Sequence, residues 1–229
     1  MASRVASTAV ATIDDSGAAS YVFDLHWNLE PVQLPDGTAH VHTGSIATTL
    51  EPGEAEVTDV LRRARPTATV SYDPNMRPTI MGDPDAVRPR VEELVALSDV
   101  VKCSEDDIEW LYPGESPSQV MARWAGLGAG LVVVTLGPRG VTWRAGSGEE
   151  DHEPAPDVVV VDTVGAGDSF MAGLVSGLLD DGLLGSADAR ARLREAGLAR
   201  VRPAIDRALA TSGLTVRRAG AYAPTREEI

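Results

Sequence analysis

The sequence predicts an α/β fold in which a mostly parallel sheet carries helices on both faces. From about residue 40 onward, short apolar runs rich in β-branched residues alternate with longer stretches of helical periodicity. This alternation is typical of parallel strands joined by crossover helices. At 229 residues the chain is long enough for one large domain with a small appendage.

The first apolar runs have a different pattern. Two β-runs, Val5–Ile13 and Ala18–Leu25, flank the turn-forming residues Asp14–Gly17, which predicts a β-hairpin. A two-stranded ribbon is only marginally stable alone. We therefore expect the hairpin to pack on the main domain or on a second copy of the chain, and we expect a homodimer.

The elements after residue 40 follow in a regular order. Short β-branched runs predict strands, and apolar residues at every third or fourth position predict helices. Strands are expected at 40–43, 67–73, 99–102 and 131–136, and helices at 54–64, 83–97, 104–111 and 117–127. The expected order ends with an antiparallel strand at 140–144, a polar loop at 145–157, a buried strand at 158–161, helices over most of 167–210 and a last strand at 214–217.

Composition limits the expected partners and compartment. The formal net charge is −14 and the pI is about 4.6, so the chain repels nucleic acid and anionic membranes, and we expect neither as a partner. The same field repels ATP, so a nucleotide site has to be built from local donors, among which Lys102 is the only lysine. Cys103 is the only cysteine, which excludes an internal disulfide and indicates a reducing compartment. With no transmembrane or secretory pattern, we expect the cytoplasm.

The most informative segment follows the last buried strand. Asp162 ends that strand, a loop with Gly165, Ala166 and Gly167 follows, and a helix is expected to begin near Asp168. Successive amides at a helix N-terminus form a site for an anion, and glycine lets a phosphate approach the backbone. In this arrangement Asp168 lies beside a transferring phosphoryl group, where it accepts the proton of an acceptor hydroxyl while the amides stabilise the developing charge.

The same segment has other interpretations. In one of them, Asp168 merely caps the helix and the glycines merely form a tight turn. Two other phosphate-binding loops are excluded by the residues present. A P-loop requires Gly-Lys followed by Ser or Thr, which the chain lacks, and a dinucleotide-binding loop requires a third glycine where Phe170 stands.

Residues 162–173 as a whole, D-T-V-G-A-G-D-S-F-x-A-G, resemble the C-terminal signature of the ribokinase-like (PfkB-type) carbohydrate kinases. Other segments resemble that family in the same order: H-T-G-S-I-A at 42–47, D-P-N-M-R-P at 73–78, V-V-K-C-S-E-D-D at 100–107, V-V-T-L-G-P-R-G at 133–140 and R-A-G-A at 218–221. The second of these resembles the fructokinase-like members. The resemblance spans nearly the whole chain. It implies a ribokinase-like three-layer α/β/α fold, with a partial β-lid hairpin and connection in 1–35 and a nucleotide-binding and catalytic domain in 36–229.

The resemblance also implies roles for matching residues. Asp168 would be the catalytic base, and the anion hole would consist of Gly165, Ala166 and Gly167. The residues that would bind ATP are Lys102, Ser104, Thr135, Gly137 and Gly140. Asn75 and Arg77 would contact the acceptor or a phosphate, although D-P-N is also strong turn chemistry.

Two cations are implied as well. Oxygen atoms of Asp162, Val164 and 215–220 would hold a monovalent cation such as K⁺ near the anion hole. Asp107 would bind hydrated Mg²⁺. Ser104-x-x-Asp107 stands where many members have N-x-x-E, so the side chain of Asp107 is one methylene shorter than the glutamate of those members. An alternative interpretation of this segment is a helix N-cap at Ser104 followed by acidic residues in the first turn.

The front of the chain departs from the family pattern. Members begin with a strand–helix portion that carries a Gly-Gly motif and an aspartate for the sugar hydroxyls, whereas Met1 falls where the lid strands are already under way. We therefore expect an N-terminally truncated fold with exposed apolar surface. The stretch Phe23–Trp27 lacks the aromatic–arginine pair of some fructokinase-like lids, which disfavours an acidic sugar. Trp27 is expected to stack on a sugar ring or to pack between subunits.

Three other features are assigned structural roles. His40 and His42 share a strand face, but no third metal ligand is evident nearby. Cys103 is expected to be a buried thiol. The arginine-rich run 190–207 has the spacing of a solvated amphipathic helix.

The sequence therefore predicts an ATP-dependent phosphotransferase that moves the γ-phosphoryl group to a sugar hydroxyl. One alternative is a truncated chain that binds nucleotide or associates with itself and has little activity. Another is a kinase of a nucleoside or a vitamin precursor, although the D-P-N-x-R-P segment favours a sugar.

Overall fold

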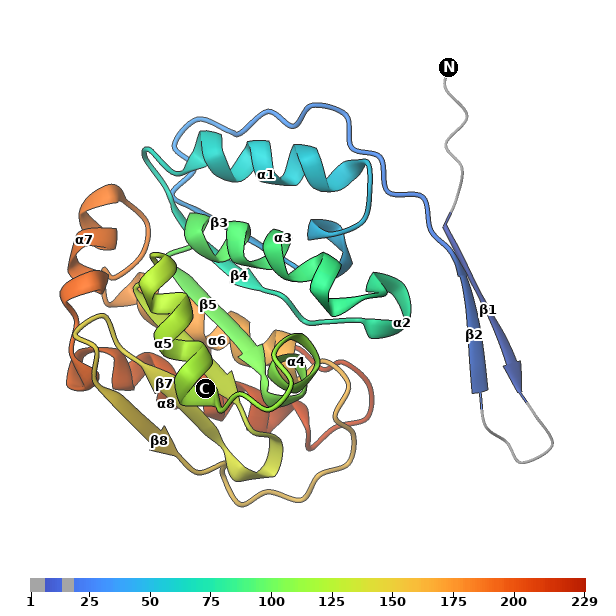
Figure 1. Cartoon of the computed structure of the whole chain (residues 1–229). Coiled ribbons are helices and arrows are strands. Elements are labelled where there is room, and N and C mark those ends of the chain that lie inside the picture. Colours follow the sequence, from blue (N-terminus) through green and yellow to red (C-terminus); the bar gives the residue numbers. More distant parts are fainter. Residues whose placement is uncertain (1–6, 14–18) are drawn as a thin grey trace.

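A six-stranded sheet forms the centre of the molecule (Figure 1). The computed structural model describes residues 7–13 and 19–229. The sheet has the order β3-β4-β5-β6-β7-β8, in which β3 to β6 run parallel and β7 and β8 are antiparallel to their neighbours. The strands are β3 (His40–Gly44), β4 (Thr69–Asp73), β5 (Val100–Ser104), β6 (Leu131–Thr135), β7 (Val141–Arg144) and β8 (Glu150–Glu153). The predicted mostly parallel α/β sheet is confirmed.

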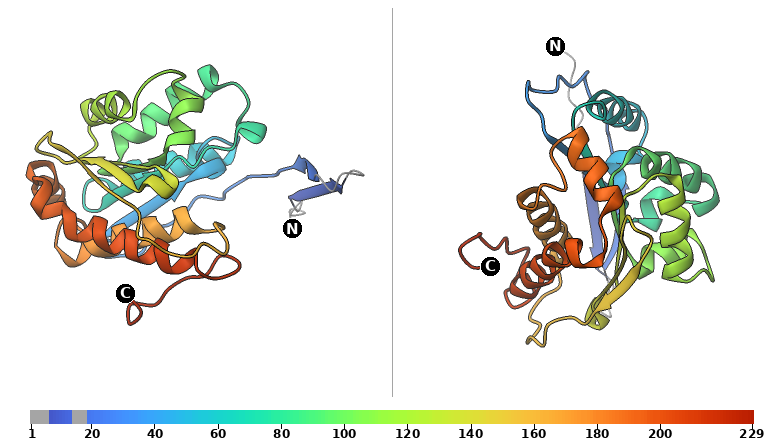
Figure 2. Two further views of the ribbon diagram at one scale, coloured as in Figure 1. Left: turned by 90° about the horizontal axis from the view of Figure 1, so that it is seen from below. Right: turned by 90° about the vertical axis from the view of Figure 1, so that its left-hand side faces the viewer.

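Helices cover both faces of this sheet, as Figure 2 shows from two further directions. One layer contains α1 (Gly53–Ala64), α3 (Pro84–Leu97), α4 (Glu105–Leu111) and α5 (Pro117–Leu127). The other contains α6 (Ala166–Asp180), α7 (Ala187–Glu195) and α8 (Leu198–Thr215). The chain thus forms three layers, α/β/α, with the sheet in the middle.

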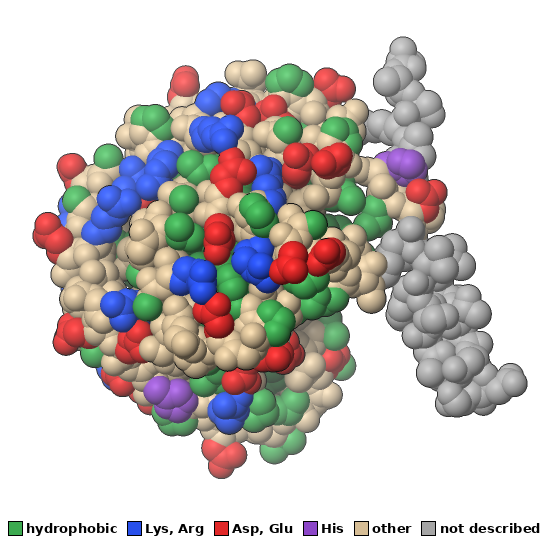
Figure 3. All heavy atoms as spheres, in the orientation of Figure 1, with side chains coloured by type: hydrophobic (Ala, Val, Ile, Leu, Met, Phe, Trp, Pro, Cys, Tyr) green, Lys and Arg blue, Asp and Glu red, His purple; other side chains and the backbone are tan. Residues whose placement is uncertain are grey.

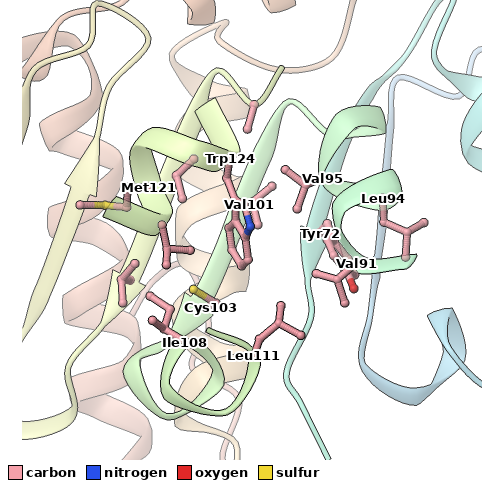
Figure 4. Packing of buried hydrophobic residues seen from close by; sticks show 14 of the residues in the cluster. Tyr72, Val91, Leu94, Val95, Val101, Cys103, Ile108, Leu111, Met121 and Trp124 are labelled. Atoms are coloured by element: carbon pink, nitrogen blue, oxygen red, sulfur yellow. The ribbon is translucent and has the colours of Figure 1, made fainter. Parts of the chain in front are cut away.

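Alternating side chains of the sheet enter two separate cores. Val101 and Cys103 of β5 face the first layer, where Trp124 of α5 and Leu94 of α3 are also fully buried (Figure 4). Val100 faces the second layer together with the apolar residues of α6 and α8. Burial on both sides explains why the strands are continuous apolar runs. Cys103 is confirmed as a buried thiol, and burial raises its pKa.

Most element boundaries lie within a few residues of the predicted ones, and short elements were missed. These are the 3₁₀ turns η1 (Ser45–Thr48) and η2 (Gly137–Arg139) and the one-turn helix α2 (Pro78–Met81). Each of the three follows the carboxyl end of a strand closely. Because each is only three or four residues long, none contains the repeat of apolar positions from which a helix is recognised.

Three predictions at the C-terminal half were wrong. The expected strand 158–161 pairs with no strand of the described chain; instead the Val161 amide donates to the Val216 carbonyl at 2.7 Å. Three of its valines, Val159, Val160 and Val161, are exposed, with Val159 at 81%. The expected loop 145–157 contains β8, and most of the expected strand 214–217 lies in or directly after the last turn of α8. A run of β-branched residues therefore predicted strands that do not form, because a strand also requires a neighbouring strand to pair with.

The predicted hairpin forms a separate two-stranded sheet of β1 (Thr8–Ile13) and β2 (Ala19–Asp24), and it projects from the body in Figure 1. Its expected turn at Asp14–Gly17 and the first residues of the expected first strand lie outside the described residues. The connection is anchored by Trp27, whose indole N–H donates to the Ala47 carbonyl at 3.0 Å and whose ring lies against Gly53. Trp27 therefore anchors the connection between the hairpin and the rest of the same chain.

The exposed surface carries both signs of charge. Figure 3 shows basic side chains interspersed with acidic ones over the face formed by the first helical layer; they are arginines, because the one lysine, Lys102, is buried. The run 190–207 contributes arginines that form ion pairs, such as Arg202 with Glu153 and Arg207 with Asp180. No helix of the described residues combines the length and the apolar character needed to cross a bilayer.

Candidate active site

The predicted site residues gather at the carboxyl end of the parallel strands. Because parallel strands end at one edge of a sheet, the loops after β3, β4, β5 and β6 adjoin one another. The segments that follow these strands begin with Ser45 of η1, Pro74, Glu105 of α4 and Leu136, respectively. The N-terminus of α6 adjoins the same edge, because Gly167 lies close to Lys102 of β5.

The loop before α6 has the backbone conformation that an anion hole requires. Gly165 is the N-cap residue, with φ of +78°, and α6 begins at Ala166. A Cβ atom on Gly165 would lie 2.9 Å from the Cβ of Ala221, so both conformation and space favour glycine. No side chain caps this helix end. The amides of the first turn therefore remain available to an anion.

Asp168 stands in the first turn of α6 and is exposed. Within the described part of the chain, no hydrogen bond occupies its carboxylate, and Gly165 is the N-cap in its place. The alternative in which Asp168 serves as the cap is therefore not what the structure shows. A free carboxylate beside a row of amides has the geometry of a proton acceptor next to an anion site.

A cavity of about 520 Å³ opens next to this loop. It brings together three residues that the sequence had placed in a nucleotide site, Thr135, Gly137 and Gly140, with Ala166 and Gly167 of the anion loop. Its size lies in the range of small-molecule sites, and most of its remaining wall is apolar. The other lining residues are Pro138, Ala155, Pro156, Asp157, Val158, Val160, Thr163, Phe170, Leu209, Ser212, Gly213 and Val216.

Sequence reasoning missed most of that apolar wall. Val158 and Val160 were assigned to a buried strand, and Ser212 and Gly213 lie between the expected helices of 167–210 and the expected strand at 214–217. They become neighbours only because α8 packs on α6 and its end lies beside the segment before the anion loop. The one local signal is the pair of small residues in the last turns of α8: a Cβ on Gly213 would lie 3.0 Å from Pro156.

Asp162 ties the anion loop to the C-terminal segment. One carboxylate oxygen accepts from the Val164 amide at 3.0 Å, and the other accepts from the Gly220 amide at 2.8 Å. These two bonds hold the pKa of Asp162 below its ordinary value. The structure therefore brings together the two segments whose oxygen atoms were predicted to hold a monovalent cation.

The loop after β4 has an unusual backbone. Asn75 has φ of +37°, and its amide donates to Asp73 in an Asx-type turn. Ser45, at the end of β3, has φ of +53°, and its hydroxyl donates to the Asn75 carbonyl at 3.0 Å. Arg77 is exposed and donates to the Asn75 side-chain oxygen at 2.6 Å. Non-glycine residues in the left-handed region gather at functional sites, and Ser45 was not among the predicted site residues.

Asp107 and Ser104 form a capping box at the start of α4. One carboxylate oxygen of Asp107 accepts from the Met76 amide at 2.7 Å, and the other accepts from the amide and hydroxyl of Ser104. The helix-cap interpretation thus has direct support, and the role of Asp107 toward Mg²⁺ stays a prediction. The described residues contain no cluster of three metal-ligating side chains, and His40 and His42 both bond to Ser71.

Lys102 and Asp73 form a buried ion pair on the face of the sheet beneath α6. The Lys102 ammonium lies 2.7 Å from a carboxylate oxygen of Asp73, and each side chain is 5% exposed. Burial raises the pKa of Asp73, and the ammonium opposes that rise. The ion pair joins the carboxyl end of β4 to β5.

Comparison with known proteins identifies this arrangement. A family model described as "pfkB family carbohydrate kinase" matches residues 7–228. The chain belongs to the PfkB family of carbohydrate kinases.

Curated and solved members of the PfkB family agree with this. A fructokinase from Klebsiella pneumoniae is 34% identical over 190 residues, which cover 80% of this chain and 62% of that protein. The structure of aminoimidazole riboside kinase from Salmonella enterica, complexed with aminoimidazole riboside and an ATP analog, matches with 28% identity and a TM-score of 0.65 over 80% of this chain and 57% of that one. A fructokinase from Vibrio cholerae O395, bound to fructose, ADP and calcium ion, matches with 25% identity and a TM-score of 0.73 over 93% and 68%.

These matches confirm the predicted family and the ribokinase-like fold. The chain spans 62%, 57% and 46% of the length of three curated fructokinases that it matches.

Proposed function

We propose that this chain carries the nucleotide-binding and catalytic part of an ATP-dependent carbohydrate kinase. The observation that carries the proposal is the uncommitted carboxylate of Asp168 beside the Gly165–Gly167 amides, next to a cavity of about 520 Å³. The walls of this cavity suit an adenosine group, since they are largely apolar with a few polar groups at one end. The end formed by Ala166 and Gly167 suits the phosphates.

The reaction transfers the γ-phosphoryl group of ATP to a sugar hydroxyl. Asp168 accepts the hydroxyl proton as the hydroxyl oxygen attacks the γ-phosphorus, and the bond between that phosphorus and the β,γ-bridging oxygen breaks to leave ADP. The amides of Gly165, Ala166 and Gly167 hold the phosphoryl oxygens while their charge is redistributed. Asn75 and Arg77 contact the acceptor or a phosphate from the neighbouring strand end.

Two cations belong to the proposal. Mg²⁺ enters with the ATP phosphates and neutralises their charge, which requires only one or two carboxylates from a protein; Asp107 is the candidate carboxylate. The segments joined by Asp162 supply oxygen atoms for K⁺, including that of Val164. Support comes from the hydrogen bonds of Asp162 and from the family. Omission of each cation, with Ca²⁺ or Na⁺ as replacement, tests these assignments through the rate of ADP formation.

The acceptor is proposed to be a neutral sugar. The curated relatives include fructokinases, and the related riboside kinase also phosphorylates a molecule that contains a sugar. Further proposals are that the chain acts as a homodimer and lacks a role in nucleic-acid or membrane binding. Sedimentation at several concentrations measures the first of these directly.

The deciding experiment is ATP turnover by the wild-type chain and by Asp168→Asn against a panel of hexoses, pentoses and ribosides. We expect acceptor-dependent ADP formation by the wild type and a loss of about 1,000-fold or more in the variant, because a positioned base is removed. We expect ADP binding, measured by calorimetry, to stay near the wild-type value. Equal loss of turnover and binding in a folded variant would contradict the role of Asp168. A wild-type chain that binds ADP but turns over no acceptor would favour the alternative of a nucleotide-binding chain.

A further inference from the structure

One side chain in the cavity of about 520 Å³ carries a charge. Among the residues that line this cavity, Asp157 alone is ionisable, and most of the others are apolar residues or glycines. The hydroxyls of Thr135 and Ser212 donate to the carbonyls of Cys103 and Leu209. No hydrogen bond or ion pair within the described chain involves the carboxylate of Asp157, which is an exposed residue. This carboxylate is therefore available to a ligand in the cavity.

The backbone that carries Asp157 is held in place on two sides. A Cβ atom on Gly140 would lie 2.6 Å from the amide nitrogen of Ala155, and a Cβ atom on Gly213 of α8 would lie 3.0 Å from a side-chain carbon of Pro156. The segment thus packs closely against both the loop after β6 and α8. The prolines on both sides of Ala155 also have fixed φ angles. The carboxylate is therefore presented from a rigid wall, as a group that recognises a ligand requires.

Asp157 lies away from the anion loop along α8. Its neighbour Pro156 meets α8 at Gly213. Val161, which lies closer to the loop in the chain, meets α8 about one turn later, at its C-cap residue Val216. Phosphates bound at the loop are anionic and repel a carboxylate, so they occupy the end of the cavity away from Asp157. The part of a nucleotide farthest from its phosphates is the base, which this geometry brings toward Asp157.

The chemistry of a carboxylate limits the bases that it can bind. An ionised carboxylate accepts hydrogen bonds and donates none. Adenine carries an exocyclic amino group, which is a donor, whereas guanine and hypoxanthine carry a carbonyl oxygen on the corresponding ring carbon. The apolar residues around Asp157 suit the faces of any of these bases. Discrimination among the bases therefore depends on the one charged group.

We propose that Asp157 selects the base of the phosphoryl donor: its carboxylate accepts a hydrogen bond from the exocyclic amino group of adenine and disfavours a base that places a carbonyl oxygen there. The inference rests on the proposed function, since it takes this cavity as the nucleotide site. A carbonyl oxygen in that place would leave two acceptors facing each other with no proton between them. A site built around a hydrogen bond rejects an analogue without the donor far more strongly than an apolar pocket does.

A solvated carboxylate at the mouth of the cavity is the competing explanation. The chain has a net charge of −14, and a negative charge near a nucleotide weakens its binding whatever base it carries. In that case Asp157→Asn raises the affinity for every nucleoside diphosphate by the same factor. In our proposal it changes the ratio of the affinities for ADP and inosine diphosphate (IDP), whose base is hypoxanthine. Asparagine has both a donor and an acceptor, so its side chain can bond to either base.

The experiment measures the binding of ADP, IDP and 2′-deoxy-ADP by calorimetry at constant Mg²⁺ concentration and ionic strength. The wild type is compared with Asp157→Asn and with Asp36→Asn, which removes the same charge from an exposed residue outside the cavity. We expect the wild type and Asp36→Asn to bind ADP about tenfold more tightly than IDP, as for one hydrogen bond to a charged, partly exposed group. We expect this preference to disappear in Asp157→Asn. Thermal unfolding of each variant checks that the fold is retained.

Each outcome separates this inference from the proposed function. A preference for ADP that survives in folded Asp157→Asn, or that the wild type lacks, overturns the proposal. So does a preference over 2′-deoxy-ADP alone that the variant loses, because the carboxylate would then bind the ribose. If the wild type binds no ADP, the cavity is not a nucleotide site, and the proposed function fails together with this inference. Acceptor turnover without a preference for ADP over IDP leaves the proposed function standing and removes only the role of Asp157.

Discussion

The carboxylates at the carboxyl edge of the sheet differ in the hydrogen bonds and ion pairs that they form. Asp73 pairs with Lys102, Asp107 accepts from Met76 and Ser104, and Asp162 accepts from two amides. Asp168 accepts no hydrogen bond in the described part of the chain. The sequence marks all four as acidic residues near strand or helix ends, and only the contacts separate the three that hold loops in place from Asp168, the proposed base.

The conformation of Gly165 leads to a prediction with a close control. Gly165→Ala places a side chain at φ of +78° and within 2.9 Å of Ala221, so we expect a loss of about 1–3 kcal/mol in unfolding free energy and a displaced anion loop. Gly37→Ala has nearly the same φ, +77°, with no atom within 4 Å of the new Cβ. Urea unfolding and ADP calorimetry should show a smaller stability loss and unchanged ADP affinity for Gly37→Ala. Equal ADP affinity in both variants would contradict the assignment of the anion loop.

At the scale of elements, the sequence was most informative where an element is decided locally. The helix at 117–127 was predicted with its observed bounds, since Ser116 and Pro117 define its start and Gly128 its end. The strand at 158–161 was predicted from valines alone and is absent, because no neighbouring strand pairs with it in the described chain. The anion loop follows from its glycines, whereas the apolar wall of the cavity depends on how α8 packs and could not be predicted.

The strand β3 carries a pH-dependent contribution to stability. Burial, helped by the neighbouring His42, lowers the pKa of His40 to about 4 from its ordinary value of 6.5, against a smaller opposing effect of Asp99. The unfolded chain therefore binds one more proton than the folded chain between these pH values, so stability is complete above pH 6.5 and falls as the pH is lowered toward 4. The full effect is of the order of 3 kcal/mol.

His40→Gln measures this contribution. The ring of His40 bonds to Thr69 and Ser71, so the variant loses some stability at pH 8 as well, where titration plays no part. We expect the difference between variant and wild type in unfolding free energy to shrink or reverse between pH 8 and pH 5. A difference that stays constant over this range would mean that His40 titrates alike in the folded and unfolded chain.

At the scale of the whole molecule, the two buried clusters and the edge of the sheet belong to one body, from which the hairpin stands apart. The residues of both clusters lie after residue 40, with Val41 of β3 as the first to pack against them. The hairpin forms its own sheet and projects outward (Figure 1). The connection between them is held by Trp27, whose indole bonds to Ala47. The body is therefore expected to keep its stability without the hairpin and to lose part of it without this anchor.

Deletion of residues 1–24 tests this division against Trp27→Ala in the full chain. Because the deletion removes no residue of either buried cluster, we expect the urea midpoint of the body to stay close to that of the full chain. Trp27→Ala removes one hydrogen bond and the packing over Gly53, so we expect a loss of about 1–3 kcal/mol in unfolding free energy although only one side chain changes.

Turnover tests a further role of the hairpin. A folded deletion variant with a raised KM for the sugar and an unchanged ADP affinity would place the hairpin over the acceptor. A deletion that lowers the urea midpoint more than Trp27→Ala would show that the hairpin is part of the folding unit, and the boundary between residues 35 and 36 would then be wrong.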